Sequence, residues 1–462
     1  MIDLFLTGFL AALIAMGLRR PFLWILAYLY VDILAPQKIS WAILAKLPVS
    51  LILFVLAFLG WVLADPKDDS RFTMRQGLLL ALLVWCGLTT LTADFPVEAA
   101  GKWSWVWKAL LFATFLPLAL RTRLRIEAAV LVMVLTAGAI IISGGMKTAM
   151  GGGGYGVLRL FVNDNTGLYE SSIISCVAIA IIPLVLWLAQ HGTVFPPDWR
   201  VRIFAVALSF ACLLMPVGTA ARTGLLCIGL LAVLSLRAVK RRFLYLGLMG
   251  AVAMMAVPFL PQSFTQRMST IENHKADQSA STRIAVWKWT LEYVQDHPMG
   301  GGFYAYLSNK ISYNTTATTS TGSVTSIESA QVNDEARAYH SSYFEMLGEQ
   351  GWPGLTIWLL LQVSGLWQME RLRRRWRERT APDEQWQAPL ATALQHAQLI
   401  YLLGSVFVGI AFQPFILMLI AVQCGLWSYL RRVDVPTAHH RIKPGLRVSA
   451  EIPWLRSLDT RR

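Results

Sequence analysis

The run "SSIISCVAIAIIPLVLWLA", residues 171–189, decides the fold class of this 462-residue chain. It contains no charged side chain, and an α-helix of its length rises about 28 Å, close to the thickness of the hydrocarbon core of a bilayer. A helix also satisfies its own backbone hydrogen bonds, as any segment in lipid must. The run therefore predicts a membrane-spanning helix.

Similar apolar runs recur along the chain, at residues 2–18, 50–64, 128–142 and 415–430. Hydrophobic residues make up 55% of the chain and charged residues only 15%. These features predict an all-α polytopic membrane protein with about twelve transmembrane helices, because a transmembrane β-barrel would show alternating hydrophobicity instead. Residues 21–36, "PFLWILAYLYVDILAP", are short for a span and lie between prolines, which indicates a half-hairpin.

The formal net charge of +14 is concentrated in basic clusters next to apolar runs. Three clusters lie at residues 121–125, 237–242 and 371–379, and the tail after Leu430 adds a fourth. This is the positive-inside pattern, so we assign the excess to topology and to contact with anionic membrane lipids, and not to nucleic acid. Residues 262–339, whose charges nearly balance, are then expected on the outer face of the membrane.

The chain divides into three regions. Residues 1–207 are predicted to hold the first transmembrane helices, with an outer segment at 149–166. Residues 208–430 are predicted to form a second helical core with one large outer loop at 261–341. The remaining residues, 431–462, form a basic tail.

The large outer loop contains two contrasting segments. Residues 281–298 predict an amphipathic helix on the membrane surface, capped by Ser281 and stopped by Pro298. Its expected apolar stripe consists of Ile284, Trp287, Leu291 and Val294. Residues 314–326, "NTTATTSTGSVTS", show no periodicity and predict a mobile flap.

Three cations at outer membrane boundaries are candidates for chemistry, because the topology rule does not require them there. Arg222 precedes an apolar run, Arg283 begins the expected surface helix, and His340 stands where the outer loop returns to the membrane. Two guanidinium groups could hold a diphosphate, and a histidine could take a proton from a hydroxyl near neutral pH. The alternatives are a membrane anchor for Arg222, pairing with loop acids for Arg283, and a helix-capping role for His340.

Other kinds of site find little support in the sequence. The outer acids lack a close carboxylate pair and no histidine cluster has ligand spacing, so we expect no metal and no cofactor. All five cysteines fall in apolar runs without a C-x-x-C spacing, so we expect no disulfide framework. The glycine-rich residues 151–156 lack the neighbours that a phosphate-binding loop needs.

Four motifs, taken in order, resemble the signature of the O-antigen ligase and polymerase superfamily of bacterial envelope enzymes. They are "TAARTGLL" at 219–226, "STRIAVWKW" at 281–289, "HPMGGGF" at 297–303 and "HSSYFEMLGEQGWPG" at 340–354. The N-terminal part further resembles the ligase branch associated with exosortase systems and protein O-glycosylation. The resemblance implies a GT-C-like enzyme of the bacterial inner membrane with its active site facing the periplasm.

The resemblance also implies roles for single residues. Arg222 and Arg283 match the diphosphate-contacting arginines, and His340 matches the essential histidine proposed to activate the acceptor hydroxyl. Arg159 in the outer segment matches a further arginine expected to contact the donor. The supporting matches are Asn165 in the same segment, Trp287 in the surface helix, and the glycine pair Gly351 and Gly354. The segment "GWPG" is expected to turn the chain from the histidine-bearing helix into the next span.

The implied function is transfer of a preassembled O-antigen glycan from undecaprenyl diphosphate to the lipid A core, with inversion and without metal. Three alternatives stay open: an O-antigen polymerase, a protein O-oligosaccharide ligase with a glycoprotein acceptor, and a lipid-linked glycan flippase. A flippase is disfavoured because transporters place charged residues near the midplane of the membrane, whereas the candidate cations here cluster at one face.

Overall fold

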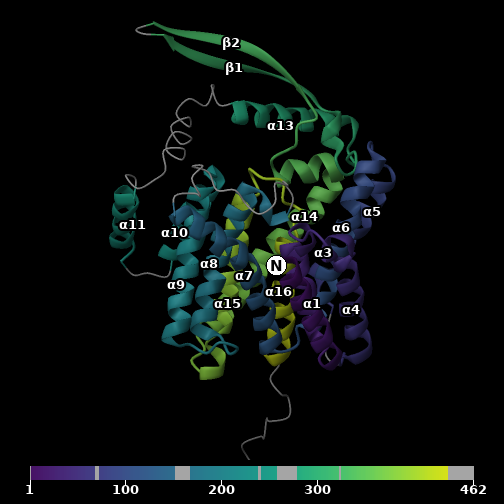
Figure 1. Cartoon of the computed structure of the whole chain (residues 1–462), viewed down its shortest axis with the longest axis vertical. Helices are drawn as coiled ribbons and strands as arrows, with labels where there is room; N and C mark the ends of the chain where they lie inside the picture. Colours follow the sequence, from purple (N-terminus) through teal and green to yellow (C-terminus); the bar gives the residue numbers. More distant parts are fainter. Residues whose placement is uncertain are drawn as a thin grey trace, which may run out of the picture.

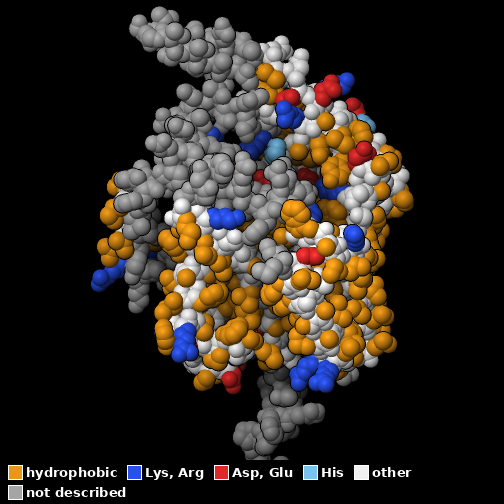
Figure 2. Space-filling model, viewed as in Figure 1, with side chains coloured by type: hydrophobic (Ala, Val, Ile, Leu, Met, Phe, Trp, Pro, Cys, Tyr) orange, Lys and Arg blue, Asp and Glu red, His pale blue; other side chains and the backbone are white. Residues whose placement is uncertain are grey.

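The computed structural model describes residues 2–67, 72–150, 167–237, 241–256, 278–321 and 324–434. Over these residues the chain forms a bundle of helices, with one long β-hairpin and a helix lying across one end (Figure 1). The sides of the bundle are largely hydrophobic, and charged side chains gather toward its two ends (Figure 2). This distribution is the one expected for a protein whose sides face lipid.

Fifteen α-helices make up nearly all the regular structure of the described residues. They are α1 (Ile2–Arg19), α2 (Phe22–Leu34), α3 (Ile43–Lys46), α4 (Val49–Ala64), α5 (Met74–Leu91), α6 (Pro96–Ala119), α7 (Arg123–Ala149), α8 (Ser171–His191), α9 (Trp199–Gly218), α10 (Arg222–Leu236), α11 (Arg242–Ala256), α13 (Gln278–Asp296), α14 (Ser342–Trp376), α15 (Gln387–Gly404) and α16 (Pro414–Val433). Strands β1 (Lys310–Thr321) and β2 (Val324–Glu335) complete the set.

Five helices of the described chain are long and apolar enough to cross a membrane: α5, α7, α8, α9 and α16. Three shorter apolar helices, α2, α4 and α10, join them. The chain is therefore a multi-pass membrane protein, while the number of twelve spans stays a prediction. Helix α2 is as short as the proline-fenced sequence indicated, with 13 residues, and it ends where Ala35 adopts a left-handed conformation before Pro36.

Helix α8, which holds the run that opened the sequence analysis, lies at the centre of the bundle. It packs against α7, α9, α10 and α15, and its side chains are buried all round from Ile173 to Val185. A helix that is apolar on every face is stable only inside a bundle or in lipid. Helix α16 is similarly buried and packs against α6 and α14.

The threonine-rich segment at 314–326 differs from the flap that its sequence predicted. Within the described residues it belongs to an antiparallel hairpin in which Lys310 pairs with Glu335 and Thr321 with Val324. Threonine is β-branched and favours extended backbone, so a threonine-rich run forms a strand where a partner is available. The absence of hydrophobic alternation therefore does not exclude a strand here.

The surface helix is present as α13, but its start and its buried face differ from the prediction. It begins at Gln278, so Ser281 lies inside it and is not the cap. Val294 of the predicted stripe is buried, but Ile284 and Leu291 are 64% and 46% exposed. Val286 and Thr290, which the stripe did not include, are fully buried. The reason is tertiary: α13 packs against β1 and joins a small core with Ile311, Tyr313 and Tyr339.

Candidate functional site

A cavity of about 630 Å³ opens at the end of the bundle that carries the hairpin. Its walls come from segments far apart in the sequence. They include Lys102 and Trp105 of α6, the start of α8, Arg283 of α13, Tyr304 and Tyr306, His340, Glu345 and Glu349 of the α14 region, and residues 407–413 between α15 and α16. Cations, carboxylates and aromatic rings thus share one hollow at a membrane end of the bundle.

His340 occupies the junction between the hairpin and α14. Its backbone is left-handed, with φ of 48°, and Ser341 then takes the N-cap position of α14 without a side-chain capping hydrogen bond. Trp287 contacts the chain on both sides of His340. Its Nε1 donates a hydrogen bond of 2.9 Å to the Tyr339 carbonyl, and its ring stacks on Phe344, in the first turn of α14, at a centroid distance of 4.9 Å. Helix α13 therefore fixes the position of His340 through Trp287.

The electrostatic surroundings of His340 favour the neutral imidazole. Desolvation by the surrounding protein lowers its pKa below the ordinary 6.5, and the positive charges of Arg283 and Arg337 lower the pKa further. The side chain remains exposed at the mouth of the cavity, so water screens part of this effect. An unprotonated histidine can accept a proton, so the surroundings keep His340 competent as a base below the usual pH range of a histidine.

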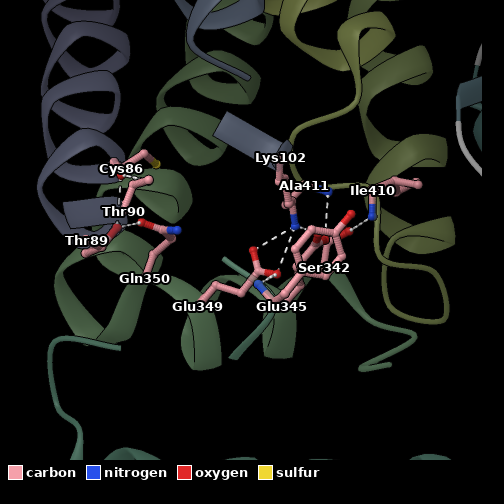
Figure 3. A network of polar contacts seen from close by, with 11 residues as sticks. Cys86, Thr89, Thr90, Lys102, Ser342, Glu345, Glu349, Gln350, Ile410 and Ala411 are labelled. Atoms are coloured by element: carbon pink, nitrogen blue, oxygen red, sulfur yellow. Dashed lines mark hydrogen bonds and ion pairs between the residues drawn. The ribbon is translucent and has the colours of Figure 1, made fainter. Parts of the chain in front are cut away.

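A buried ion cluster lies deeper in the same cavity (Figure 3). Lys102 points from α6 between two glutamates of α14: its Nζ lies 2.7 Å from Glu345 Oε1 and 2.7 Å from Glu349 Oε2. All three side chains are buried. The ammonium also lies 5.1–5.5 Å from the ring centroids of Phe303, Tyr304 and Phe412, which adds a cation–π attraction.

The carboxylates of this cluster also tie two loops to α14. Glu345 Oε2 accepts a hydrogen bond from the Ala411 amide at 3.2 Å, and Glu349 Oε1 accepts one from the Tyr304 amide at 3.0 Å. The hydroxyl of Ser342, one turn earlier, accepts a hydrogen bond from the Ile410 amide at 2.8 Å (Figure 3). The same hydroxyl donates to the Val408 carbonyl at 2.9 Å. The first turns of α14 therefore organise most of the cavity wall.

The glycines of two motifs meet backbone to backbone beside the cavity. Gly300 and Gly351 both have positive φ, 82° and 65°, and a Cβ on either would come within 2.4 Å of the other segment's backbone. Gly302 donates its amide hydrogen bond of 2.9 Å to the Glu349 carbonyl. Gly351 also marks the break in α14, where the "GWPG" turn was expected, so residues 297–303 dock on the hinge between the histidine-bearing helix and the long helix.

Gly354, the second glycine of the predicted pair, lies on the first turn after this break. A Cβ there would lie 2.3 Å from the Cβ of Gln350 and 3.2 Å from the Trp85 ring. Gln350 is in turn held by α5, since it receives a 2.7 Å hydrogen bond from the Thr89 hydroxyl (Figure 3). Gly354 therefore permits close packing of α14 on α5, and its role beside the site is structural.

The other arginines and the asparagine predicted for the site do not lie in the described cavity lining. Arg222 is the first residue of α10, whose neighbour α8 begins at the cavity wall. It is not among the residues that line the cavity, so the structure brings Arg283 and His340 together but leaves Arg222 outside their shared lining. Arg159 and Asn165, with the rest of 151–166, lie outside the described residues.

The sequence interpretation missed the Lys102 cluster. Two signals were present: a lysine inside a predominantly apolar helix, and two glutamates four residues apart in "EMLGE", which places both on one face of a helix. An ionisable side chain within a membrane helix is a functional candidate by default. Among the described residues no group of three histidine, cysteine, aspartate or glutamate side chains could hold a metal ion.

Two family models match the chain. Residues 1–193 match a family of unknown function (DUF5935), and residues 204–359 match the O-antigen ligase family. No curated protein matches the chain. The second match covers α13, the hairpin, His340 and the break in α14, so Arg283 and His340 both lie in the part of the chain that is similar to the O-antigen ligase family.

Proposed function

We propose that this glycosyltransferase moves a preassembled O-antigen glycan en bloc from undecaprenyl diphosphate to the terminal sugar of the lipid A core. The reaction would take place at the periplasmic face of the bacterial inner membrane. The observation that carries the proposal is the joint lining of one cavity by Arg283 and His340 within the region that matches the O-antigen ligase family. The cavity lies at an end of the helix bundle, where a polar donor headgroup meets water.

In the proposed reaction, the acceptor hydroxyl oxygen attacks the anomeric carbon of the glycan. The bond between that carbon and the diphosphate oxygen breaks, and undecaprenyl diphosphate leaves with the electron pair. His340 takes the hydroxyl proton, and Arg283 stabilises the charge of the leaving group. Attack from the side opposite to the diphosphate inverts the anomeric centre.

The interior of the cavity suits a sugar. Tyr304, Tyr306 and Trp105 offer aromatic faces, and Glu345 and Glu349 offer acceptors for sugar hydroxyl groups. The two carboxylates outnumber Lys102, so this part repels a diphosphate. We therefore place the diphosphate at the cationic rim near Arg283 and the sugars beside the buried cluster.

Three other assignments are compatible with the family match. A polymerase would use a second lipid-linked glycan as acceptor, and a protein O-oligosaccharide ligase would use a glycoprotein. A flippase would need a charge-lined path between the two leaflets. The cavity charges instead lie at one end of the bundle, which favours transfer over transport.

The direct test is an assay of the purified chain in liposomes with a lipid-linked glycan donor. Three acceptors are offered separately: rough lipopolysaccharide, a second lipid-linked glycan and an acceptor protein. We expect the glycan to appear on the lipopolysaccharide, as a shift in gel mobility. Transfer only to one of the other acceptors would reassign the reaction, and transbilayer movement of the donor without transfer to any acceptor would favour the flippase.

Replacement of Arg283 by lysine is expected to reduce kcat/KM for the donor by roughly tenfold to a hundredfold. Lysine keeps the charge but loses the planar pair of donors, and one charge-assisted hydrogen bond contributes about 1.5–3 kcal/mol. Arg337→Lys is the matched control, because Arg337 also acts on His340 through its charge but does not line the cavity and pairs with Asp334 at 2.9 Å. Arg222→Lys, measured beside them, decides whether the second arginine takes part. Full activity of Arg283→Lys at equal protein level would refute the diphosphate contact.

Replacement of Arg337 by glutamine should move the acid limb of the pH–rate profile to higher pH. Arg337 helps to hold the pKa of His340 below its ordinary value, and activity requires the neutral imidazole. In the wild type the limb should therefore lie below pH 6.5, and loss of this positive charge should raise the pKa. The measurement is the single-turnover rate against pH, and a limb that stays in place or moves to lower pH would exclude His340 as the titrating base.

Transfer is expected to continue in the presence of EDTA. The prediction rests on the sequence, which offers no outer carboxylate pair or ligand cluster, and on the cations at the rim, which supply positive charge to the leaving group. The measurement compares initial rates before and after chelation. Loss of activity that magnesium or manganese restores would show that a metal takes part.

A further inference from the structure

A second site lies between the last turns of α14 and α16, remote from the cavity. It is a pocket of about 170 Å³ whose lining includes Arg371, Arg375 and Trp376 of α14 and Trp427, Arg431 and Asp434 of the α16 end. We propose that it binds the phosphate headgroup of an anionic glycerophospholipid. The inference is independent of the proposed transfer reaction, because none of these residues lines the catalytic cavity.

The charges of the pocket are unbalanced. Asp434 is its acid, and this carboxylate already pairs with Arg375 and with the neighbouring Arg379. Arg371 and Arg431 have no carboxylate within ion-pair distance in the part of the chain that the structure describes. A phosphate group would supply the missing negative charge, and arginine is the side chain best suited to it.

Tryptophan rings hold these two arginines in place. The guanidinium carbon of Arg371 lies 5.3 Å from the ring centroid of Trp367 and 5.9 Å from that of Trp427, and Arg431 lies 5.8 Å from Trp427. A guanidinium that stacks on a ring can still donate hydrogen bonds from its edge. Tryptophan and arginine are also the residues that anchor helices at the boundary between hydrocarbon and headgroups.

An exposed apolar stripe leads along α14 to this pocket. Leu360, Val363 and Trp367 are 50%, 62% and 57% exposed, and their spacing of three and four residues places them on one face of the helix, followed four residues later by Arg371. An acyl chain against the stripe and a phosphate at the arginines match the two ends of one lipid. A soluble phosphate would leave the stripe without a role.

The site faces the leaflet opposite to the cavity. Glu349, in the cavity, lies just before the break in α14 at Gly351. From this break the helix continues for twenty residues to Arg371, a length that rises about 30 Å, the thickness of the hydrocarbon core. The chain's own residues 435–462 suit the pocket poorly, because they carry six basic and two acidic side chains. Negative phospholipid headgroups are therefore the ligand that the charge favours.

The test is native mass spectrometry of the full chain in detergent, titrated with phosphatidylglycerol or with phosphatidylcholine of the same acyl chains. We expect the wild type to retain phosphatidylglycerol preferentially. The double variant Arg371→Gln with Arg431→Gln should weaken this binding by roughly thirtyfold and leave phosphatidylcholine unaffected. The matched control is Arg374→Gln with Arg377→Gln, which removes two charges from the same helix end but none from the pocket.

Each other outcome overturns the proposal. Equal loss in the control variant would mean a general charge effect, and unchanged retention in the pocket variant would mean another occupant, such as residues 435–462. Competition by sn-glycerol 3-phosphate at the same concentration as the lipid would make this a site for a soluble anion. A second double variant, Arg371→Lys with Arg431→Lys, keeps the charge and should retain part of the binding. It therefore distinguishes loss of the ligand contacts from a folding defect.

Discussion

Replacement of His340 by alanine should lower the rate of glycan transfer by roughly two to four powers of ten, the usual range for a lost general base. Donor binding should change little, because Arg283 still contacts the diphosphate in the proposed complex. The measurement is single-turnover transfer together with a separate determination of donor affinity. A large loss of rate at nearly constant affinity is the signature of a residue that acts in the transition state.

The backbone at His340 calls for a second variant. Its φ of 48° lies in the left-handed region, where asparagine is favoured and alanine is not. His340→Asn therefore keeps the local conformation but removes the base, and it should show the same rate loss with the thermal stability of the wild type. His297→Ala is the control, because His297 is another histidine of the outer region, stacks on Tyr293 and does not line the cavity. If His340→Asn transfers bound donor at the normal rate but binds it poorly, His340 is a positioning residue.

Much of the bundle could be predicted because lipid imposes a simple rule on the sequence. A segment in hydrocarbon must be apolar and about 20 residues long, and for this reason the run at 171–189 falls within α8 and the run at 415–430 within α16. The proline fence at 21–36 likewise marks the short helix α2. These predictions depend on the lipid that surrounds a helix and not on the segment against which the helix packs.

Predictions that depend on a partner were less successful. Helix α13 carries two possible packing faces, and its contact with β1 and Tyr339 buries Val286 and Thr290 and leaves Ile284 and Leu291 exposed. The hairpin is similar, since a threonine-rich run becomes a strand only when a second strand pairs with it. Local patterns do not contain this information.

The buried cluster is the clearest example of such a dependence. Lys102 is separated from Glu345 and Glu349 by 243 and 247 residues, so no local spacing relates them. For this reason the sequence predicts His340 and Arg283, which lie in recognisable motifs, but does not predict the residues of the cavity interior. The interior is created where the Lys102 side chain reaches from α6 to the first turns of α14, and where the loop before α16 joins them.

Loss of Lys102 is expected to destabilise the protein by about 3–5 kcal/mol, because it leaves buried carboxylates without a countercharge. Glu345 and Glu349 share this single ammonium, and both side chains are buried. Unfolding of Lys102→Met in mixed micelles, followed by circular dichroism, gives the size of the effect. Lys288→Met is the control: Lys288 is exposed on α13 at the same end of the bundle, so its loss should cost much less.

A triple variant separates the charge from the packing. Lys102→Met combined with Glu345→Gln and Glu349→Gln removes all three charges, and much of the lost stability should return, because neutral amides are less costly to bury than unpaired carboxylates and can still accept hydrogen bonds from the Ala411 and Tyr304 amides. Transfer activity should stay low in this variant, since the proposed sugar contacts of the carboxylates are weakened. If Lys102→Met is as stable as the wild type, the cluster is not an obligatory ion pair. If the triple variant recovers full activity with its stability, the cluster supports the fold alone and takes no part in sugar binding.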